Sequence, residues 1–191
     1  MTSLIEQLDA ERERLNTLRH PFYLKWSAGE LSREELAVYA GQYRHAVVAL
    51  AELAARDGDP QHAREEAAHV ELWDAFVDGV GGSRDEATPE TQALVDALRD
   101  TDGAGVDAVL YSLEAMQPSV AQSKLEGLQR FYGFSGDEPA CAYFRVHSTL
   151  DDEHAEQAAT RLEARSDTEG ALASATAALE ANWRLLDGVT V

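Results

Sequence analysis

Apolar residues recur every three or four positions along nearly the whole chain, and this spacing constrains the fold more than any other feature. Between residues 36 and 53 they form one continuous stripe, made of Leu36, Tyr39, Tyr43, Val47, Leu50 and Leu53. Residues at this spacing share one face of an α-helix and can pack against other helices. No segment alternates apolar and polar residues for long enough to predict a strand. The sequence therefore predicts an all-α fold.

Start and stop signals divide this pattern into a bundle of seven to eight helices. Ser32 to Glu35 forms a capping box, and the turn at residues 57–60 places Pro60 to begin the next helix. The expected helices cover residues 2–19, a long segment after 32, and then 61–80, 89–101, 106–116, 120–132, 140–165 and 168–186, with a short aromatic segment at 22–26. No linker or repeat interrupts them, so we expect one domain over residues 1–191.

The chain is strongly acidic. Its 191 residues include 35 Asp and Glu against 16 Lys and Arg, which gives a formal charge of −19. Phosphate recognition needs a basic surface, so this composition argues against nucleic-acid binding. A hydrophobic content of 45% argues against disorder and favours a folded, halophilic protein with a carboxylate-rich surface. Only two lysines remain, Lys25 and Lys124.

Cysteine content and hydropathy predict the compartment. A single cysteine, Cys141, excludes a disulfide framework and a four-cysteine zinc site. No apolar run approaches the ~18–20 residues of a membrane span. The first residues lack the basic and apolar regions of a signal peptide. We therefore expect a cytoplasmic protein without a membrane partner.

One predicted helix carries His147, Asp151 and His154. Offsets of four and seven residues place these side chains within about 60° of one another around the helix. Two imidazoles and a carboxylate on one face can share one metal ion or bridge two. In a chain this acidic the same pattern also arises by chance, so the prediction needs support from elsewhere.

A second helix supplies that support. Glu66 and His69 have the Glu-x-x-His spacing with which di-iron carboxylate bundles present two ligands, and His62 lies two turns before His69. The competing interpretation is an acidic solvated face. Glu114 lies in an apolar stretch, where a carboxylate must be paired, protonated or metal-bound. Together with Asp151, these carboxylates predict a centre whose charge two divalent ions would offset.

Several motifs resemble those of the haem-oxygenase-like dimetal oxidases, within the TenA/PqqC-like superfamily. In order along the chain they are HPFYLKWSAGEL (20–31), YAGQY (39–43), HVELW (69–73), EAMQP (114–118), KLEGL (124–128), YFRVH (143–147) and DDEH (151–154). The resemblance covers the chain from about Leu4 to Arg165. It implies a haem-oxygenase-like helical bundle.

The resemblance also implies a chemistry. It predicts a centre of two Fe ions, or Fe and Mn, with O₂ as co-substrate and an unidentified reductant. The positions that match family metal ligands are His69, Glu114, His147, Asp151 and His154. The family's 4-aminobenzoate synthase cuts one of its own tyrosines into product and takes nitrogen from one of its own lysines. The matching positions are Tyr23 and Lys124, while Tyr39 and Tyr43 match aromatic residues that line the site. By analogy with the family we expect a homodimer.

Three departures from the family pattern bear on this prediction. The family's remaining ligand is a glutamate seven residues before the first histidine, and His62 occupies that position. Either His62 binds metal, or Glu66, or less favourably Glu65, takes the role. The connection from Tyr43 to His69 is shorter by roughly four helical turns. Leu113 stands where a second aromatic residue is expected.

Other functions remain open from the sequence. The same metal centre can act on an external small molecule, with Tyr23 only lining the pocket. A metal-free thiaminase-type relative would use a cysteine nucleophile, but Cys141 lies about 120° from the His147 face and has no evident activating base. A cofactorless relative of the pyrroloquinoline-quinone biosynthesis type would not need Asp151 and Glu114 together. A non-enzymatic binding bundle is the last alternative.

Overall fold

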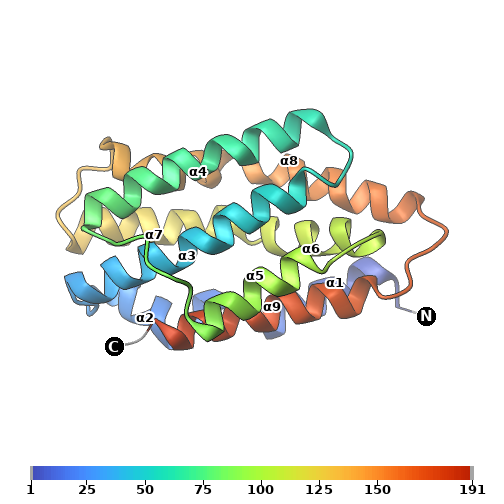
Figure 1. Cartoon of the computed structure of the whole chain (residues 1–191), viewed down its shortest axis with the longest axis horizontal. Helices are drawn as coiled ribbons and strands as arrows, with labels where there is room; N and C mark the ends of the chain where they lie inside the picture. Colours follow the sequence, from blue (N-terminus) through green and yellow to red (C-terminus); the bar gives the residue numbers. More distant parts are fainter. Residues whose placement is uncertain (1, 190–191) are drawn as a thin grey trace.

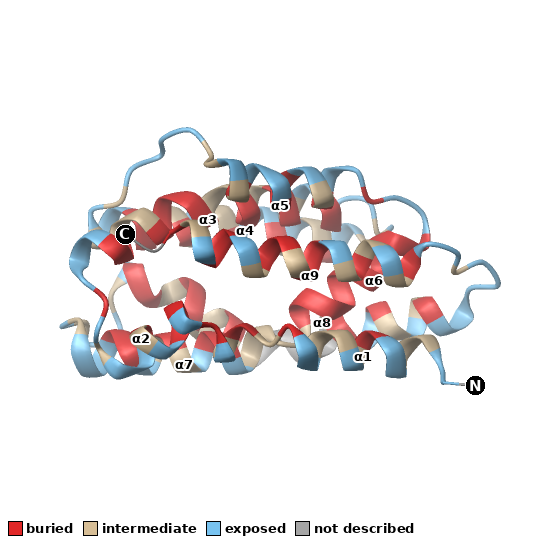
Figure 2. Cartoon of the chain, turned by 90° about the horizontal axis from the view of Figure 1, so that it is seen from below, coloured by how far each residue is buried: buried red, intermediate tan, exposed pale blue. Residues whose placement is uncertain are grey.

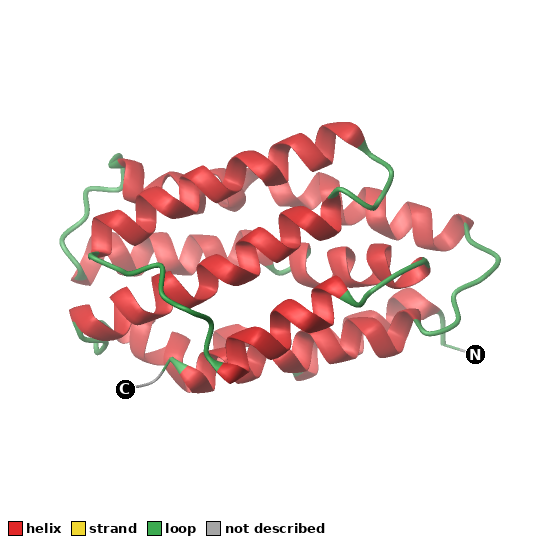
Figure 3. Ribbon diagram, viewed as in Figure 1, coloured by secondary structure: helices red, strands yellow, loops and turns green. Residues whose placement is uncertain are grey.

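All regular structure in the part of the chain that the computed structural model describes is helical (Figure 3). The model describes residues 2–189, and the side chains of all of these except 149–153. The α-helices are α1 (Leu4–Arg14), α2 (Pro21–Ala28), α3 (Arg33–Ala54), α4 (Pro60–Val80), α5 (Pro89–Arg99), α6 (Ala104–Glu114), α7 (Gln117–Phe131), α8 (Ala142–Ala164) and α9 (Ala171–Gly188) (Figure 1). The all-α prediction is confirmed.

The number of helices exceeds the expected seven to eight, because residues 2–189 contain nine α-helices and two short 3-10 helices. The aromatic segment is itself a helix, α2, which begins at Pro21 after a cap from the His20 ring. The first predicted helix is interrupted, because the Asn16 side chain accepts a hydrogen bond from the Leu18 N–H and caps a separate 3-10 helix, Thr17–Arg19. Pro139–Cys141 forms the other 3-10 helix, before α8.

Three helices meet where the candidate ligands lie. Helices α3 and α4 form an antiparallel hairpin, and α4 also contacts α8 (Figure 1). Helix α6 packs against both α8 and α9. This arrangement brings α4, α6 and α8, which carry all the predicted histidine and glutamate ligands, together in the interior.

Burial follows the helical periodicity, with buried faces turned inward and exposed faces outward (Figure 2). The largest fully buried side chains are aromatic and include Trp26, Trp73, Tyr39, Phe22, Phe76 and Phe144. Many of these rings meet edge to face, an arrangement that adds about 0.5–1.5 kcal/mol per pair beyond burial. Within residues 2–189, no helix is both long enough and apolar enough to cross a membrane.

A glycine allows α7 to approach α2 closely. A Cβ at Gly127 would lie 2.5 Å from the Trp26 ring, so a larger residue would push the two helices apart. At this contact the Trp26 indole N–H donates to the Lys124 carbonyl at 3.1 Å. The close packing therefore fixes the position of Lys124 on the inner side of α7.

Candidate metal centre

Four histidines face each other across α4 and α8. Each helix carries two of them seven residues apart, which corresponds to a rise of about 10 Å along the helix axis. The helices are antiparallel, so His62 lies opposite His154 and His69 lies opposite His147. In both pairs the ring centroids are 4.3 Å apart. The two histidine pairs thus form the framework of two neighbouring clusters.

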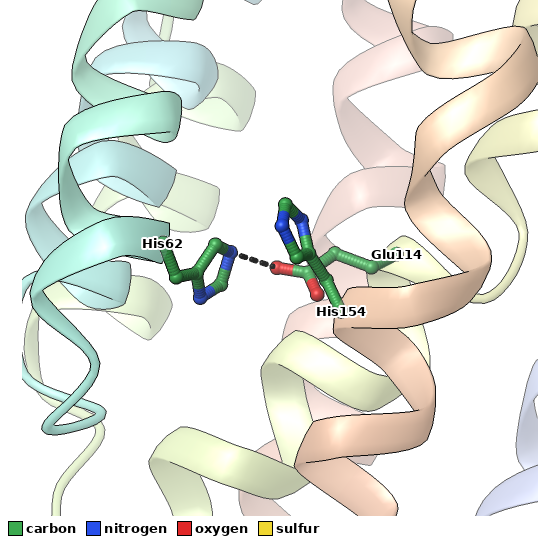
Figure 4. A group of neighbouring side chains, drawn as sticks. All are labelled: His62, Glu114 and His154. Atoms are coloured by element: carbon green, nitrogen blue, oxygen red, sulfur yellow. Dashed lines mark ion pairs between the residues drawn. The ribbon is translucent and has the colours of Figure 1, made fainter.

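The first group, which we call the His62 cluster, consists of His62 on α4, Glu114 on α6 and His154 on α8 (Figure 4). One potential ligand atom from each residue lies within 4.8 Å of the other two. The Nε2 atom of His62 is 3.2 Å from Oε1 of Glu114. Three helices therefore place two imidazoles and a carboxylate around one point.

The second group, which we call the His69 cluster, consists of Glu66 and His69 on α4 and His147 on α8. Nδ1 of His69 lies 2.8 Å from Oε1 of Glu66. Nδ1 of His147 lies 2.9 Å from the Tyr143 carbonyl oxygen, which can only accept a hydrogen bond. Nδ1 of His147 therefore carries the hydrogen, and Nε2 is the nitrogen whose lone pair a metal ion can use.

Hydrogen bonding within the clusters fits metal ligation. Among the described residues, six buried side-chain nitrogen or oxygen atoms lack a hydrogen-bond partner, and three of them belong to these clusters: His62 Nε2, His69 Nδ1 and Glu114 Oε2. The short His62–Glu114 and His69–Glu66 distances therefore do not have the geometry of hydrogen bonds. Orphaned buried polar atoms are costly, and a cation at each cluster would satisfy them. Imidazole and carboxylate donors suit iron.

The pKa values show how strongly these groups interact. Burial lowers the pKa of His62, but the Glu114 and Asp57 carboxylates outweigh this and raise it to about 9. Burial also raises the pKa of Glu114. Burial and the neighbouring His69 lower the pKa of His147 to about 4. Burial opposes ionisation of Glu66, yet His69 and the other nearby imidazoles hold its pKa below the ordinary value. A bound cation would displace a proton from His62.

Two of the predicted ligands need separate mention. The side chain of Asp151 lies outside the described residues. Glu65 belongs to neither cluster. Its side chain is about half-exposed, and its Oε2 pairs with Nε2 of His154 at 2.9 Å. His62 and Glu66, which the sequence offered as alternatives, both join a cluster, one in each.

Lys124 occupies a second buried polar region, beside the aromatic core. Its Nζ donates a hydrogen bond to the Tyr39 hydroxyl at 2.5 Å and lies 4.7 Å from the centroid of the Tyr23 ring. Burial holds the Lys124 pKa well below its ordinary value, which favours the neutral amine. Lys25, in contrast, is half-exposed, and its Nζ lies 3.7 Å from Glu35 Oε1. Only one of the two lysines is therefore in a reactive setting.

The three predicted tyrosines surround this amine. The hydroxyls of Tyr23 and Tyr39 are 3.0 Å apart, and the Tyr43 ring centroid lies 5.1 Å from Lys124 Nζ. Tyr23 and Tyr43 also line a cavity of about 20 Å³, together with Thr17, Leu50, Leu113, Met116, Gln117, Val120 and Asn182. That volume holds about one water molecule.

Two aromatic residues that we did not predict as functional connect the regions. Tyr143 stacks on His147 of the His69 cluster, with 3.9 Å between ring centroids. Trp73 lies 4.7 Å from Tyr143 and 5.9 Å from Tyr39. Their spacing from the candidate ligands could have indicated them in the sequence, because Tyr143 precedes His147 by one helical turn and Trp73 follows His69 by one.

Cys141 lies in the buried core, and burial raises the pKa of its thiol. A thiol of raised pKa is a weak nucleophile at neutral pH. This setting does not favour the thiaminase-type alternative.

A helical bundle with two buried carboxylate–histidine clusters on facing helices is typical of non-haem metal-dependent redox enzymes. Comparison with known proteins agrees. Residues 57–187 match the model of a family described as "Iron-containing redox enzyme". Since the match covers well over half of the chain, the chain belongs to this family and is an oxidoreductase. The matched segment includes both clusters and Lys124.

Curated relatives extend over nearly the whole chain. The chain is 32% identical to the "4-aminobenzoate synthase" of Chlamydia muridarum, over 97% of this chain and 89% of that protein. It is 30% identical to the protein of the same name from Nitrosomonas europaea, over 96% of this chain and 89% of the relative. A crystal structure from Shewanella denitrificans, described as having a heme oxygenase-like fold, superposes with a TM-score of 0.70 at 19% identity, over 97% and 90% of the two chains. The predicted haem-oxygenase-like fold is confirmed.

Proposed function

We propose that this chain is a dimetal, O₂-dependent 4-aminobenzoate synthase that consumes its own Tyr23 and Lys124. The observation that carries the proposal is the buried Lys124 amine, hydrogen-bonded to Tyr39 and lying over the Tyr23 ring. A surface lysine would be protonated and mobile, whereas this amine has a fixed neighbour and a pKa that burial lowers toward the nucleophilic, neutral form. The names of the curated relatives support the same product.

The atoms of the two side chains account for the product. The ring and Cβ of a tyrosine contain all the carbon atoms of 4-aminobenzoate, and Lys124 Nζ supplies the nitrogen. The Cα–Cβ bond of Tyr23 breaks, and Cα keeps a hydrogen in its place. The Cε–Nζ bond of Lys124 breaks, and Cε is oxidised to an aldehyde. A carbon–nitrogen bond replaces the phenolic carbon–oxygen bond, whose oxygen leaves as water, and Cβ is oxidised to a carboxylate. O₂ is the oxidant, and an external reductant provides the remaining electrons. Each chain therefore acts once.

Tyr39 lies between the two reacting groups. It accepts a hydrogen bond from Lys124 Nζ at 2.5 Å, and its own hydroxyl lies 3.0 Å from that of Tyr23. Tyr39 can thus pass a proton between the Tyr23 oxygen and the Lys124 nitrogen. Burial raises the pKa of both tyrosines well above the ordinary value, which keeps their hydroxyls protonated until the reaction begins.

The two clusters are our proposed metal sites. The His62 cluster and the His69 cluster would each hold one ion, as two Fe or as Fe and Mn, and Asp151 is a further candidate ligand. When bound, the ions would reduce O₂ and thereby allow it to oxidise the substrate. The rings of Tyr143, Trp73 and Tyr39 form an unbroken series of contacts from His147 toward Tyr23, along which an electron can pass.

The cavity size favours an internal source of substrate over an external one. Pockets that bind small molecules usually measure ~300–1,000 Å³. The cavity beside Tyr23 measures about 20 Å³, too small to hold a second aromatic ring. Tyr23 itself therefore occupies the place where an external aromatic substrate would have to bind.

Isotope labelling tests the proposal. Protein carrying isotope-labelled tyrosine and lysine, loaded with Fe(II) and given O₂ and a reductant, should release 4-aminobenzoate with both labels, even when unlabelled tyrosine and lysine are present in excess. Unlabelled product formed from an added small molecule would overturn self-consumption. In cells, the wild-type chain should restore growth of a 4-aminobenzoate auxotroph, whereas Lys124→Arg should not.

A further inference from the structure

Asp57 lies in the turn before α4 and was not among the predicted functional residues. Its carboxylate is nevertheless fully buried beside the His62 cluster. Its Oδ1 accepts a hydrogen bond from the Asp59 N–H at 2.7 Å. Its Oδ2 lies 2.7 Å from Nδ1 of His62 and accepts from the Arg161 guanidinium at 3.0 Å. The carboxylate of Asp57 thus has three polar partners, and one of them is the Nδ1 atom of His62, a candidate metal ligand.

This contact fixes the orientation of the His62 ring. A carboxylate that already receives bonds from Arg161 and the backbone acts as an acceptor, so His62 donates from Nδ1. The other nitrogen, Nε2, then points at the cluster, 3.2 Å from Glu114 Oε1 and without a hydrogen-bond partner among the described residues. The ring therefore presents Nε2 to the place where a cation would lie.

The turn that carries Asp57 is built for this contact. Gly58 has φ = 91°, a conformation that residues with a Cβ rarely adopt, and it folds the chain back on itself. Asp59 then caps α4 by accepting hydrogen bonds from the Gln61 and His62 N–H groups. As a result the carboxylate of Asp57 reaches the ring of His62, in the first turn of the helix.

A buried ion network holds Asp57 in place. Arg161 bridges Asp57 and Asp107, with 2.6 Å between its Nε and Asp107 Oδ1. Asp107 lies seven residues before Glu114 on α6, and Arg161 lies seven residues after His154 on α8. The network thus joins the same three chain segments that supply the His62 cluster, two helical turns away from it.

We propose that Asp57 is a positioning residue for the metal ion of the His62 cluster. It holds His62 in the tautomer that ligates through Nε2, and its negative charge strengthens that nitrogen as a donor. Carboxylate partners of this kind behind a ligating histidine raise metal affinity by about 10–100-fold. The inference rests on the proposed function in one respect, namely that the cluster binds metal.

The His69 cluster offers an internal comparison. There the Nδ1 partner of His147 is the uncharged carbonyl of Tyr143, and His69 Nδ1 faces Glu66 of the same cluster. The ion pairs of Asp57 among the described residues are with His62 and Arg161, and His69 pairs instead with Glu66. Loss of Asp57 should therefore weaken one of the two metal sites and leave the other unchanged.

The test is titration of the metal-free chain with Co(II), followed by its visible absorption and by competition with a chelator. We expect two binding steps in the wild type. In Asp57→Ala one step should weaken about 10–100-fold while the other keeps its affinity. Asp57→Asn, which retains an acceptor of the same shape, should weaken the same step less. His62→Gln should affect that same step, which assigns it to this cluster.

Asp107→Asn is the matched control, since it removes an equally buried partner of Arg161 without touching His62. It should lower the melting temperature but leave both Co(II) affinities unchanged. Equal Co(II) affinities in wild type and Asp57→Ala would overturn the positioning role. If Asp57→Ala does not fold, equal affinities in wild type and folded Asp57→Asn would do so. A wild-type chain that binds no metal would instead refute the proposed function.

Discussion

The two carboxylate–histidine clusters and the Lys124 region are all buried, but they differ in the charge that their neighbouring atoms favour. In the clusters, carboxylate and imidazole atoms face one another with orphaned lone pairs, and a cation would satisfy them. Around Lys124 the neighbours are aromatic rings and a hydroxyl, and no described carboxylate forms an ion pair with the amine. The first region is suited to hold a cation, whereas burial in the second disfavours the charged form of the amine. One small core therefore contains two regions that favour opposite charge states.

Removing the ligand from α6 should have the largest effect. Glu114→Gln keeps the size of the side chain but removes the charge at the His62 cluster, so we expect loss of metal and of all 4-aminobenzoate formation. Elemental analysis of anaerobically loaded protein and assay of the product measure both. Glu126→Gln, on the exposed face of α7, is the control and should behave as wild type. Full metal content in Glu114→Gln would contradict the assignment.

A substitution in the Lys124 region alone should abolish product formation without affecting metal binding. Lys124→Arg keeps a basic side chain but cannot release an Nζ amine, so product should fall below detection while metal content stays at the wild-type level. Lys25→Arg changes the other, half-exposed lysine and should retain full yield. Product formed by Lys124→Arg would show that the nitrogen comes from elsewhere.

The low pKa of Lys124 predicts how stability depends on pH. In the unfolded chain this amine titrates near its ordinary pKa of ~10.4, whereas burial lowers its pKa in the folded chain. Between these two values the unfolded chain binds more protons, so the free energy of unfolding should rise with pH, by at most about 1.4 kcal/mol per unit from this group.

Lys124→Met removes that contribution. Urea unfolding of the metal-free proteins should show the variant more stable at pH 7 by about 1–3 kcal/mol, the usual cost of burying a poorly paired polar group. The difference between the two proteins should shrink as the pH rises toward 10. Parallel stability curves over this range would show that Lys124 is not desolvated.

The smallest effect is expected at Cys141. Cys141→Ala should leave the product yield unchanged and lower the unfolding free energy by about 1 kcal/mol, because only a small core side chain is shortened. The assays are product yield and urea unfolding. Loss of a thiamin-cleaving activity in this variant would favour the thiaminase-type alternative.

Periodicity predicted most of the fold, because long amphipathic helices such as α3 and α4 leave a repeating apolar signal. It missed α2 as a helix, since eight mostly apolar residues carry too little periodicity. For the site, the spacing of His62, His69, His147 and His154 showed which faces carry ligands. It could not show that α4 and α8 run antiparallel, which decides that His62 meets His154.

Other parts of the site depend on packing that no local pattern records. Nothing in the residues around Lys124 distinguishes a buried lysine from a surface one, and its burial comes from the close approach of α7 to α2 at Gly127. Asp57 likewise reads as an ordinary turn residue until the turn is folded against His62.

The most direct test of the central claim is mass spectrometry of the chain before and after reaction. Protein loaded with Fe(II) and exposed to O₂ and a reductant should yield peptides in which Tyr23 has lost its side chain and Lys124 has lost its amino nitrogen, in proportion to the 4-aminobenzoate released. Unchanged masses at both residues in protein that has consumed O₂ would contradict the account.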